Sequence, residues 1–369
     1  MLTYSARHGY ANDWHLNHLG KFAVGGVGLV FVESTKVDAR GCTTPNDLGL
    51  WKDEFIPALK RITELIHSCG AAAGLQLGHS GRKARNSLPW EGRMPLAKWS
   101  GVDHGEAWEI IGPSAIAHSP RAATPRAMSK ADIQALIEAW GLATQRAIKA
   151  GFDVVEIHGA HGYLLHQFLS SKANQRDDEY GGSLTNRMRF ALEVTEEVRR
   201  YWPHDKPLFF RISAVDEDSW TLDDSVVLAK ELRQRGVDVV DCSSGGMTPD
   251  SVVAHTTPQS YGYQVPYADR IRRDAKVMTM AVGLIIHADQ AESVLVEGKA
   301  DLVAIGRELL YNPHWVLDAA VKLGVADAYS VVPPNYGYWL EKRAQAGFGQ
   351  HQSTRGNSLA AVATQAERG

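Results

Sequence analysis

Short apolar runs recur along the chain, each bounded by glycine, serine or aspartate. They are nearly continuous in hydrophobic residues instead of alternating with polar ones, which is typical of strands covered on both faces, as in parallel sheets. Each run is too short to favour a buried helix. The pattern therefore predicts seven strands, at 27–32, 72–77, 153–157, 208–212, 237–242, 277–282 and 302–305.

Segments with helical periodicity lie between these runs. Apolar side chains recur three and four positions apart at 55–66, from Ser129 to Gly151, through Phe190 to Trp202, and at about 223–235, 288–297 and 315–322. Strands that alternate with helices predict a parallel sheet with helical crossovers. Seven such units indicate a TIM (β/α)8 barrel, which needs eight strands.

An open doubly wound sheet is the alternative to a barrel. Its dinucleotide-binding form carries a G-x-G-x-x-G fingerprint that follows the first strand and opens a helix. Here the glycines at Gly25–Gly28 (GGVG) precede a predicted strand, so the sequence favours the barrel.

We expect a single barrel domain over residues 1–346, with an excursion loop at about 85–127 that is rich in proline, glycine and tryptophan. Residues 347–369 are small and polar, and we expect a disordered tail there. The place of the eighth strand would be before Val27, where the sequence begins abruptly with MLTYSA. We therefore expect a barrel whose first strand is truncated at the N-terminus.

Composition narrows the class of protein. The 369 residues are 44% hydrophobic with a formal net charge of −3, so the basic excess of a nucleic-acid-binding or membrane-surface protein is missing. The three cysteines show no CxxC spacing and cannot form a disulfide framework, which favours a reducing compartment. No apolar run approaches the about 20 residues of a membrane helix, and the first residues lack a signal-peptide core. A cytoplasmic enzyme is the expectation.

The segment Glu156–Phe168 (EIHGAHGYLLHQF) follows a predicted strand at the end where barrels carry their active sites. His158 and His161 are three residues apart, and Tyr163 follows two later. Two imidazoles on one short loop can donate to a single carbonyl oxygen, and a nearby phenol can deliver a proton. A metal site is another interpretation, although the HExxH pattern is absent.

Two polar side chains interrupt strands that are otherwise apolar. Gln76 lies in the run 72–77 and Arg211 in PLFFRIS, at 207–213. A buried amide needs hydrogen-bond partners, and a buried guanidinium needs an anionic or electron-rich partner. For Gln76 the alternatives are a bridge between strands or a bound group. For Arg211 they are a structural carboxylate or a cofactor that acquires negative charge.

The last two predicted strands end in glycines, Gly283 (AVG) and Gly306 followed by Arg307 (AIGR). Many barrels bind phosphate at this place through backbone N–H groups, and an arginine adds a charge-assisted contact. The aromatic side chains Tyr4, Trp315 and Trp339 are candidate walls of a substrate pocket. Together these features describe a phosphate-bearing cofactor in a barrel mouth.

The sequence resembles the old yellow enzyme family of FMN-dependent ene-reductases, and within it the bacterial class related to xenobiotic reductases and thermophilic-type NADPH dehydrogenases. The resemblance runs from Met1 to about Trp339. Its most specific block extends from GFDVVEIHGAHGYLLHQFLS to DEYGGSLTNRMRF. Further motifs that carry it are MLTYSA, LQLGHSGRKA, FFRISA, AVG and ADLVAIGRELL.

The resemblance implies a TIM barrel with FMN at its mouth and NAD(P)H as co-substrate. It implies that hydride passes through flavin N5 to the β-carbon of an α,β-unsaturated carbonyl, that His158 and His161 bind the carbonyl oxygen, and that Tyr163 protonates the α-carbon. Tyr4 would line the substrate pocket. The implied flavin contacts are Ser34, Gln76, Arg211, Gly283, Gly306 and Arg307.

The resemblance also implies a homo-oligomer, a dimer or tetramer, because relatives can extend a C-terminal aromatic or arginine into a neighbouring subunit's site. Trp339 and Arg343 lie in that region. The sequence departs from the class at Leu2, where a cysteine is common, and in lacking a segment before Met1. Two alternative functions stay open: a metal-dependent barrel hydrolase that uses His79, His158 and His161, and a truncated flavin binder without catalysis.

Overall fold

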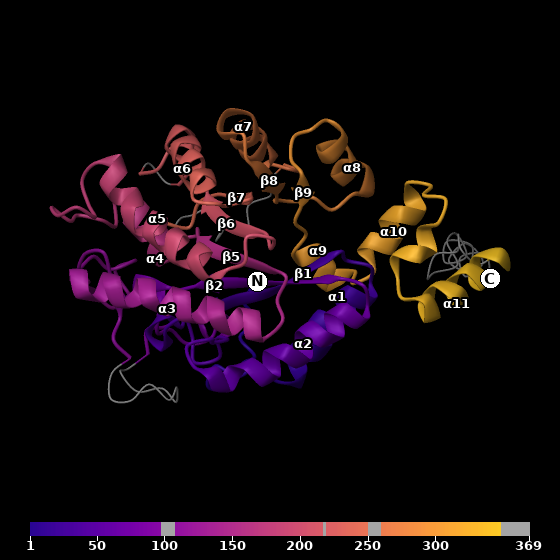
Figure 1. Cartoon of the computed structure of the whole chain (residues 1–369), viewed down its shortest axis with the longest axis horizontal. Coiled ribbons are helices and arrows are strands. Elements are labelled where there is room, and N and C mark those ends of the chain that lie inside the picture. Colours follow the sequence, from indigo (N-terminus) through magenta and orange to yellow (C-terminus); the bar gives the residue numbers. More distant parts are fainter. Residues whose placement is uncertain (97–107, 217–218, 250–259, 348–369) are drawn as a thin grey trace, which may run out of the picture.

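A computed structural model describes residues 1–96, 108–216, 219–249 and 260–347. Within them, seven parallel strands form one curled sheet in the order β1-β2-β5-β6-β7-β8-β9, and helices cover its outer face (Figure 1). The eighth strand of a complete barrel is not among the described strands, of which β1 and β9 are the edges. The strands are β1 (Leu29–Lys36), β2 (Ala72–Gly78), β5 (Val154–Gly159), β6 (Leu208–Ser213), β7 (Val239–Ser243), β8 (Met278–Ala281) and β9 (Leu302–Val303).

All seven predicted strands are confirmed, within a few residues at their ends. So are the helices that periodicity predicted: α2 (Ile56–Ser68), α3 (Lys130–Lys149), α5 (Leu184–Tyr201), α6 (Leu222–Gln234), α8 (Ala288–Val296) and α10 (Trp315–Lys322). Side-chain caps fix several starts; the Ser129 and Thr221 side chains accept hydrogen bonds from the first turns of α3 and α6. Further helices are α1 (Asp13–Val24), α4 (Leu164–Leu169), α7 (Val265–Ala275), α9 (Arg307–Tyr311) and α11 (Pro334–Gln345).

Alternation along the strands separates two kinds of side chain. On β5, Val155 and Ile157 belong to the large core cluster that includes residues of the surrounding helices. Val154 belongs instead to a small cluster made of strand residues, together with Phe209, Val239 and Met280. Because strand side chains alternate between faces, Glu156 and His158 share the inner face with Val154.

The same alternation sorts the inner face into layers. An apolar layer formed by the small cluster is followed by a polar layer, which contains Gln76, Glu156, Arg211 and Asp241 on neighbouring strands. The next inward positions toward the carboxyl ends are His158, Ser213 and Ser243. The sheet therefore carries its chemistry at the carboxyl end, as barrel enzymes do.

A bulge in β1 changes which of its side chains point inward. Val32 pairs with Leu75, but Thr35 pairs with Leu77, so β1 has one residue more than β2 between these pairs. Without the extra residue, Lys36 would share the outward face of Val32. The bulge instead places Lys36 opposite Gly78, on the inner face.

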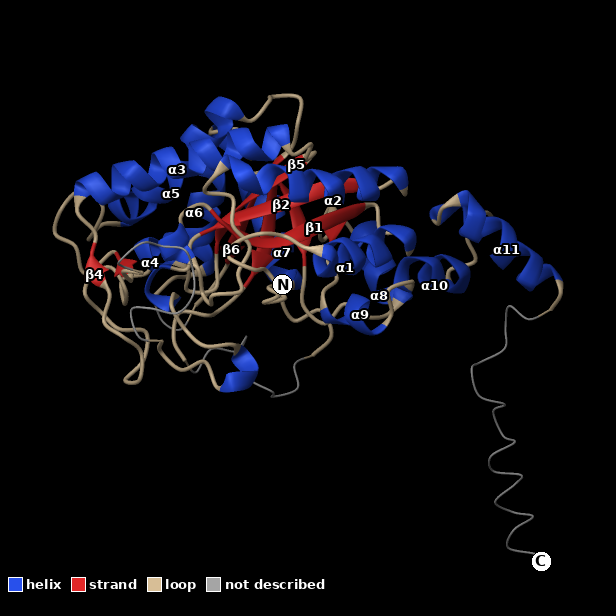
Figure 2. Cartoon of the chain, turned by 90° about the horizontal axis from the view of Figure 1, so that it is seen from below, coloured by secondary structure: helices blue, strands red, loops and turns tan. Residues whose placement is uncertain are grey.

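Two regions lie apart from the sheet. The excursion loop predicted at 85–127 contains β3 (Ile111–Gly112) and β4 (Arg126–Ala127), which pair with each other; residues 97–107 are outside the described part. Helix α11 projects away from the body (Figure 2). The predicted tail falls outside the described residues from 348 onward. No helix among the described residues is long and apolar enough to cross a membrane.

Candidate active site

A tight turn after β5 brings the predicted histidines together. The Tyr163 N–H donates to the Ala160 carbonyl at 3.0 Å, and His161 and Gly162 occupy the middle of the turn with φ of 56° and 67°. Positive φ at both central positions is typical of a type I′ turn. A side chain at Gly162 would place its Cβ 2.1 Å from the Gly246 carbonyl oxygen, so only glycine fits there.

The turn brings the imidazole rings of His158 and His161 next to each other. His161 Nδ1 lies 3.4 Å from His158 Nε2, and the two ring centroids are 5.2 Å apart. The Ala160 N–H donates to His158 Nδ1 at 3.2 Å, which leaves the His158 proton on Nε2. His161 Nε2 lies 2.8 Å from the Ser243 hydroxyl. The adjacent nitrogens His158 Nε2 and His161 Nδ1 can thus act as a pair toward one oxygen atom.

The Tyr163 ring packs against this pair. Its centroid is 4.9 Å from that of His158, and burial raises the pKa of its phenol to about 12. The hydroxyl hydrogen-bonds Thr43 on the loop after β1, which opposes that rise. Tyr163 is therefore protonated at neutral pH and available as an acid. Tyr4 is close enough to Tyr163 for the charge of the Tyr163 phenol to raise its pKa, so Tyr4 lies beside the same site.

Burial keeps the histidines of this region neutral. Removal from water lowers the pKa of His158 and of His161 well below the usual value, and the positive charge of Arg211 adds to this effect. Burial also lowers the pKa of His79 to about 4. Neutral imidazoles can still donate one hydrogen bond each, which is what binding a carbonyl oxygen requires.

We expect the folded state to lose stability as the pH falls below about 6.5, the usual histidine value. The pKa values of the buried histidines are lowered in the folded state, so in that range the unfolded chain binds more protons than the folded chain. The free energy of unfolding therefore decreases as the pH falls. Urea unfolding midpoints between about pH 7.5 and pH 5 measure this. His79→Asn should flatten the dependence, and the same change at exposed His204 should not. An unaltered slope in the His79 variant would contradict the assignment.

Arg211 and Gln76 meet two buried carboxyls. Arg211 Nη1 lies 3.2 Å from Asp241 Oδ2, and Gln76 Nε2 donates to Glu156 Oε1 at 2.6 Å. Burial raises the pKa of Glu156 and of Asp241, and the negative charge of Asp241 adds to the rise at Glu156. Of the alternatives left open above, the structure shows a carboxylate partner for Arg211 and an interstrand bridge for Gln76.

These contacts leave part of the Arg211 guanidinium available for a further hydrogen bond. Its Nε atom is buried and has no hydrogen-bond partner among the described residues. Buried N–H groups are rarely left unpaired, so Arg211 fits a ligand with an acceptor at its edge, as a flavin has. Ser34 is buried nearby: a Cβ at Gly78 would lie 2.9 Å from Ser34 Oγ and 3.3 Å from His158 Cβ.

The predicted phosphate residues lie at the ends of the last two strands. Gly283 has φ of 116°, and a Cβ there would meet Gln264 Nε2 at 2.7 Å. Gly306 precedes α9, and a Cβ there would approach only Met1 among the described residues, whose sulfur would be 3.6 Å away. Arg307 is exposed at the start of α9. The open space beside Gly306 fits a phosphate group at the start of a helix, whereas Gln264 crowds Gly283.

Trp315 and Trp339, which were predicted to line the substrate pocket, lie away from the histidines and Tyr163. Trp315 is buried at the start of α10, and its indole N–H donates to the Ile286 carbonyl at 2.8 Å. Trp339 is 70% exposed on α11, away from the strand ends (Figure 2). The structure does not bring either side chain of this chain to the histidines and Tyr163 of the same chain.

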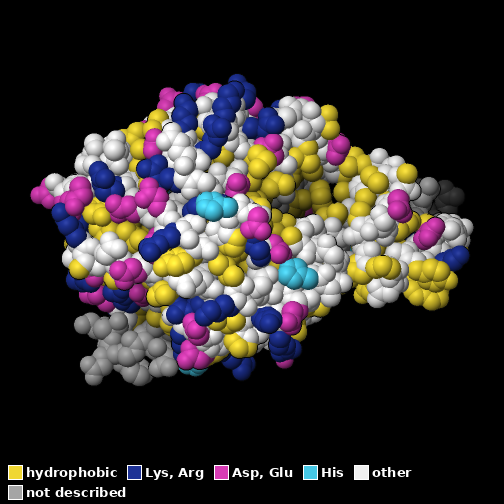
Figure 3. All heavy atoms as spheres, viewed as in Figure 1, with side chains coloured by type: hydrophobic (Ala, Val, Ile, Leu, Met, Phe, Trp, Pro, Cys, Tyr) yellow, Lys and Arg dark blue, Asp and Glu magenta, His cyan; other side chains and the backbone are white. Residues whose placement is uncertain are grey.

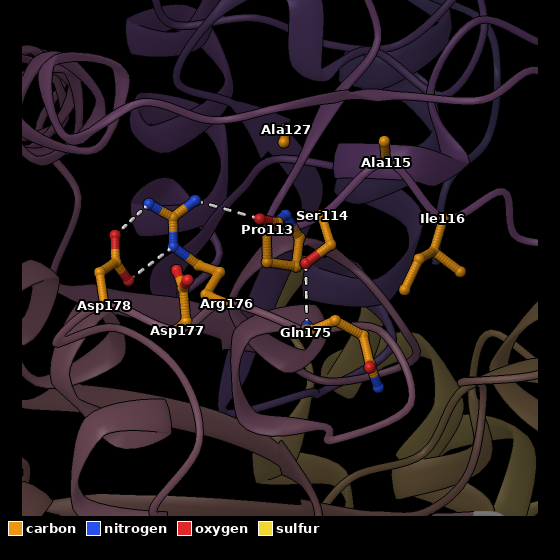
Figure 4. A pocket seen from close by; sticks show the side chains of 9 residues that line it. All are labelled: Pro113, Ser114, Ala115, Ile116, Ala127, Gln175, Arg176, Asp177 and Asp178. Carbon is orange, nitrogen blue, oxygen red and sulfur yellow. Dashed lines mark hydrogen bonds and ion pairs between the residues drawn. The ribbon is translucent and has the colours of Figure 1, made fainter.

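A separate surface pocket of about 570 Å³ lies between the β3–β4 region and the loop after α4 (Figure 4). Arg176 dominates one wall and bonds Asp178, the Pro113 carbonyl and the Met128 carbonyl. These bonds join two loops, so we interpret Arg176 as a structural residue. The pocket contains none of the predicted site residues.

Sequence reasoning missed several residues of the site. Ser213 accepts a hydrogen bond from the His161 N–H at 2.9 Å, and Ser243 contacts the His161 ring. Lys36 and Asp47 are buried beside Tyr163. Arg82, within the motif LQLGHSGRKA, is buried and donates to the Met247 carbonyl at 2.9 Å. Lys36 lies beyond the predicted apolar run at 27–32, so the strand pattern did not single it out.

Comparison with known proteins identifies relatives over most of the chain. A model of the NADH:flavin oxidoreductase / NADH oxidase family matches residues 1–325. The chain is 44% identical over 333 residues to an NADPH dehydrogenase of Geobacillus sp. (strain WCH70), covering 90% of each protein. It is 45% identical to an NADPH dehydrogenase of Geobacillus thermodenitrificans (strain NG80-2), covering 88% of each.

Solved structures with a similar fold include two reductases. Morphinone reductase superposes with a TM-score of 0.71 at 25% identity, covering 88% of this chain and 84% of that one. A complex of 2-naphthoyl-CoA reductase with 2-naphthoyl-CoA superposes with a TM-score of 0.77 at 25% identity, covering 90% of this chain and 50% of the other.

Proposed function

The chain belongs to the NADH:flavin oxidoreductase / NADH oxidase family, and from that premise we propose that it is an ene-reductase that reduces α,β-unsaturated carbonyl compounds. It is an oxidoreductase that uses FMN and a nicotinamide co-substrate. The proposal concerns the acceptor and the roles of individual residues. The observation that carries it is the pair of neutral imidazoles beside a protonated phenol at the carboxyl end of β5.

When bound, FMN would supply the redox chemistry, the transfer of hydride from NAD(P)H to the β-carbon of the substrate. Arg211 and Gln76 would hold the flavin ring with Ser34. Gly283, Gly306 and Arg307 would hold its phosphate. The unpaired Arg211 Nε and the open space beside Gly306 support these roles.

His158 and His161 would bind the carbonyl oxygen between His158 Nε2 and His161 Nδ1. Hydrogen bonds there withdraw electron density from the β-carbon and strengthen as the oxygen becomes enolate-like. For His161 to donate through Nδ1, its Nε2 must accept, and the Ser243 hydroxyl 2.8 Å away can donate to it in place of its longer, 3.3 Å hydrogen bond to Gln264 Oε1. Ser243 would thus select the tautomer of His161.

Tyr163 would protonate the α-carbon, with Tyr4 lining the substrate pocket. The phenol is protonated at neutral pH because burial raises its pKa to about 12, so it acts as an acid and not as a base. Thr43 hydrogen-bonds the hydroxyl and would stabilise the oxygen once its proton has left.

Helix α11 supports a homo-oligomer, a dimer or tetramer. Hydrophobic side chains gather over the α10–α11 region in Figure 3, and Tyr336, Tyr338 and Trp339 are 45%, 56% and 70% exposed. Aromatic side chains clustered on a projecting helix are typical of a contact surface. We infer that a second copy covers them, with Trp339 and Arg343 as candidate contacts.

A visible spectrum followed by two anaerobic additions tests the function. We expect a yellow protein that is bleached by NADPH and recovers its flavin absorbance when an enone such as cyclohexenone is added. Bleaching without recovery would indicate a flavin binder that does not reduce enones. A colourless protein inhibited by chelators would indicate a metal-dependent hydrolase, for which the described residues provide no group of three ligands.

A further inference from the structure

Lys36 is a lysine buried completely in the barrel interior. Its side chain and that of Asp47 both have 0% exposure, and the ammonium lies 3.6 Å from Asp47 Oδ2. The ammonium also donates to Ser34 Oγ at 3.2 Å and lies 5.0 Å from the centroid of the Tyr163 ring. Burying a lysine is costly, so a site that keeps one is expected to use its charge.

The bulge in β1 is what brings Lys36 to this position. It places Lys36 opposite Gly78 on the inner face, where strict alternation would have turned it outward with Val32. Bulges commonly re-aim a side chain next to an active site. The ammonium consequently lies between the loop that carries Asp47 and the face of Tyr163.

Asp47 holds the loop that supports the Tyr163 hydroxyl. Its carboxylate accepts hydrogen bonds from the Thr43 N–H at 2.6 Å and from the Thr44 hydroxyl at 2.8 Å. Thr43 in turn hydrogen-bonds the Tyr163 hydroxyl. The negative charge of Asp47 has an adverse effect, however, because it raises the pKa of Tyr163 and so opposes loss of the phenolic proton.

We propose that Lys36 is a positioning residue: its ammonium offsets the charge of Asp47, so that Asp47 can hold the Thr43 loop without preventing Tyr163 from releasing its proton. The inference rests on the proposed function, in which Tyr163 is the acid. The O–H electrons stay on the phenol oxygen when the proton leaves for the α-carbon, and the phenolate regains a proton from solvent. Lys36 touches neither reacting atom and acts through Tyr163.

The other charged or titratable groups near Tyr163 do not replace Lys36. Lys83 is 6.0 Å from the ring centroid, and its ammonium donates to the His161 carbonyl at 2.8 Å. Arg93 also lowers the pKa of Tyr163, but its side chain is exposed. His158 is neutral because its pKa is lowered by burial, and Tyr4 is an un-ionised phenol because burial raises its pKa. Lys36 therefore provides the cation that contacts both Asp47 and the ring.

The first readout is the titration of Tyr163 itself, measured in FMN-loaded protein by ¹⁹F NMR with 3-fluorotyrosine. Fluorination lowers tyrosine pKa values, which brings the titration into an accessible range, and the signal lost in Tyr163→Phe assigns the resonance. Lys36→Met should raise the apparent pKa of Tyr163 by about one unit or more, because a nearby charge is removed. Asp47→Asn should lower it, and the double variant should return it close to the wild-type value.

The second readout separates proton transfer from the rest of turnover. Lys36→Met should slow enone reduction roughly tenfold, in proportion to a one-unit pKa change. Turnover with ferricyanide, which takes electrons and needs no proton on carbon, should stay near the wild-type rate. In a Tyr163→Phe background, Lys36→Met should have no additional effect on enone turnover.

The outcomes distinguish a positioning role of Lys36 from a purely structural one. If Lys36→Met leaves the Tyr163 titration unmoved, or slows enone and ferricyanide turnover equally, Lys36 is only structural. If the variant does not fold, the predicted opposite shift in Asp47→Asn still decides the question. If Tyr163→Phe reduces enones at the wild-type rate, the proposed acid is wrong, while the fluorine titration still shows whether Lys36 offsets Asp47.

Discussion

Replacing both active-site histidines, in His158→Ala/His161→Ala, should lower kcat/KM for an enone by about 10³-fold or more, because two donors to the developing oxyanion are lost together. The two nitrogens that would face the substrate oxygen lie 3.4 Å apart, and each ring is oriented by a contact to its other nitrogen. The flavin should stay bound, since neither imidazole is among the proposed flavin contacts. Stopped-flow measurement of flavin reoxidation by cyclohexenone, with a flavin spectrum of each variant, provides the test.

Two further variants show whether the effect is specific to donors at this place. His158→Asn/His161→Asn keeps an amide N–H on each side chain and should recover part of the lost rate. His67→Ala serves as a matched control, because His67 bonds Asp153 at the opposite end of the same strand segment. Reduction of the flavin by NADPH should be similar in all three. An alanine pair that still reduces enones at the wild-type rate would overturn the assigned roles.

The fold was predictable because strand and helix patterns are local. The runs at 154–157 and 208–212, for example, are apolar without interruption except at the residues that face inward, and they became β5 and β6 almost residue for residue. Helix α7 escaped prediction because five charged residues in its last seven positions obscure its apolar face. Helix α1 starts where the Asn12 side chain caps it, a signal that the periodicity does not contain.

The histidines and Tyr163 were predictable because one short turn carries them, so spacing in sequence translated directly into proximity. Lys36, Asp47 and Ser243 were not, since three separate segments bring them together. For Lys36 there is a specific reason: a strict two-residue alternation assigns it to the face of Val32, and only the register with β2 reveals the bulge that reverses it.

For Arg211, the sequence predicted the need for a partner but not which partner. A guanidinium in an apolar strand must have an anionic or electron-rich partner, but the sequence alone does not say which. The structure places Asp241 on the neighbouring strand at 3.2 Å and leaves Nε without a partner among the described residues. The two alternatives are therefore compatible, because one part of the side chain can stabilise the buried carboxyls while another binds the flavin.

Arg211→Met should accordingly lower both the stability of the protein and its affinity for FMN. The free energy of unfolding should fall by about 3–5 kcal/mol, because a buried carboxyl pair loses its cation. FMN affinity should fall at least about tenfold, because a charge-assisted hydrogen bond is lost. Thermal or urea unfolding of the protein with saturating FMN, together with fluorescence titration of free flavin, measures both effects.

The double variant Arg211→Met/Asp241→Asn separates the two roles. Removing the carboxylate charge together with its partner should restore most of the lost stability, because replacing a whole buried ion pair costs far less than breaking one. It should not restore flavin affinity, because the donor aimed at the flavin is still missing. If the double variant regained the wild-type FMN affinity, Arg211 would act only through Asp241, and the flavin contact would have to be assigned to Gln76 and its neighbours. If the stability of the double variant stayed low, we would conclude that Arg211 stabilises the folded protein by packing. The raised pKa values of Glu156 and Asp241 would then mean that these carboxyls are already largely neutral in the folded protein.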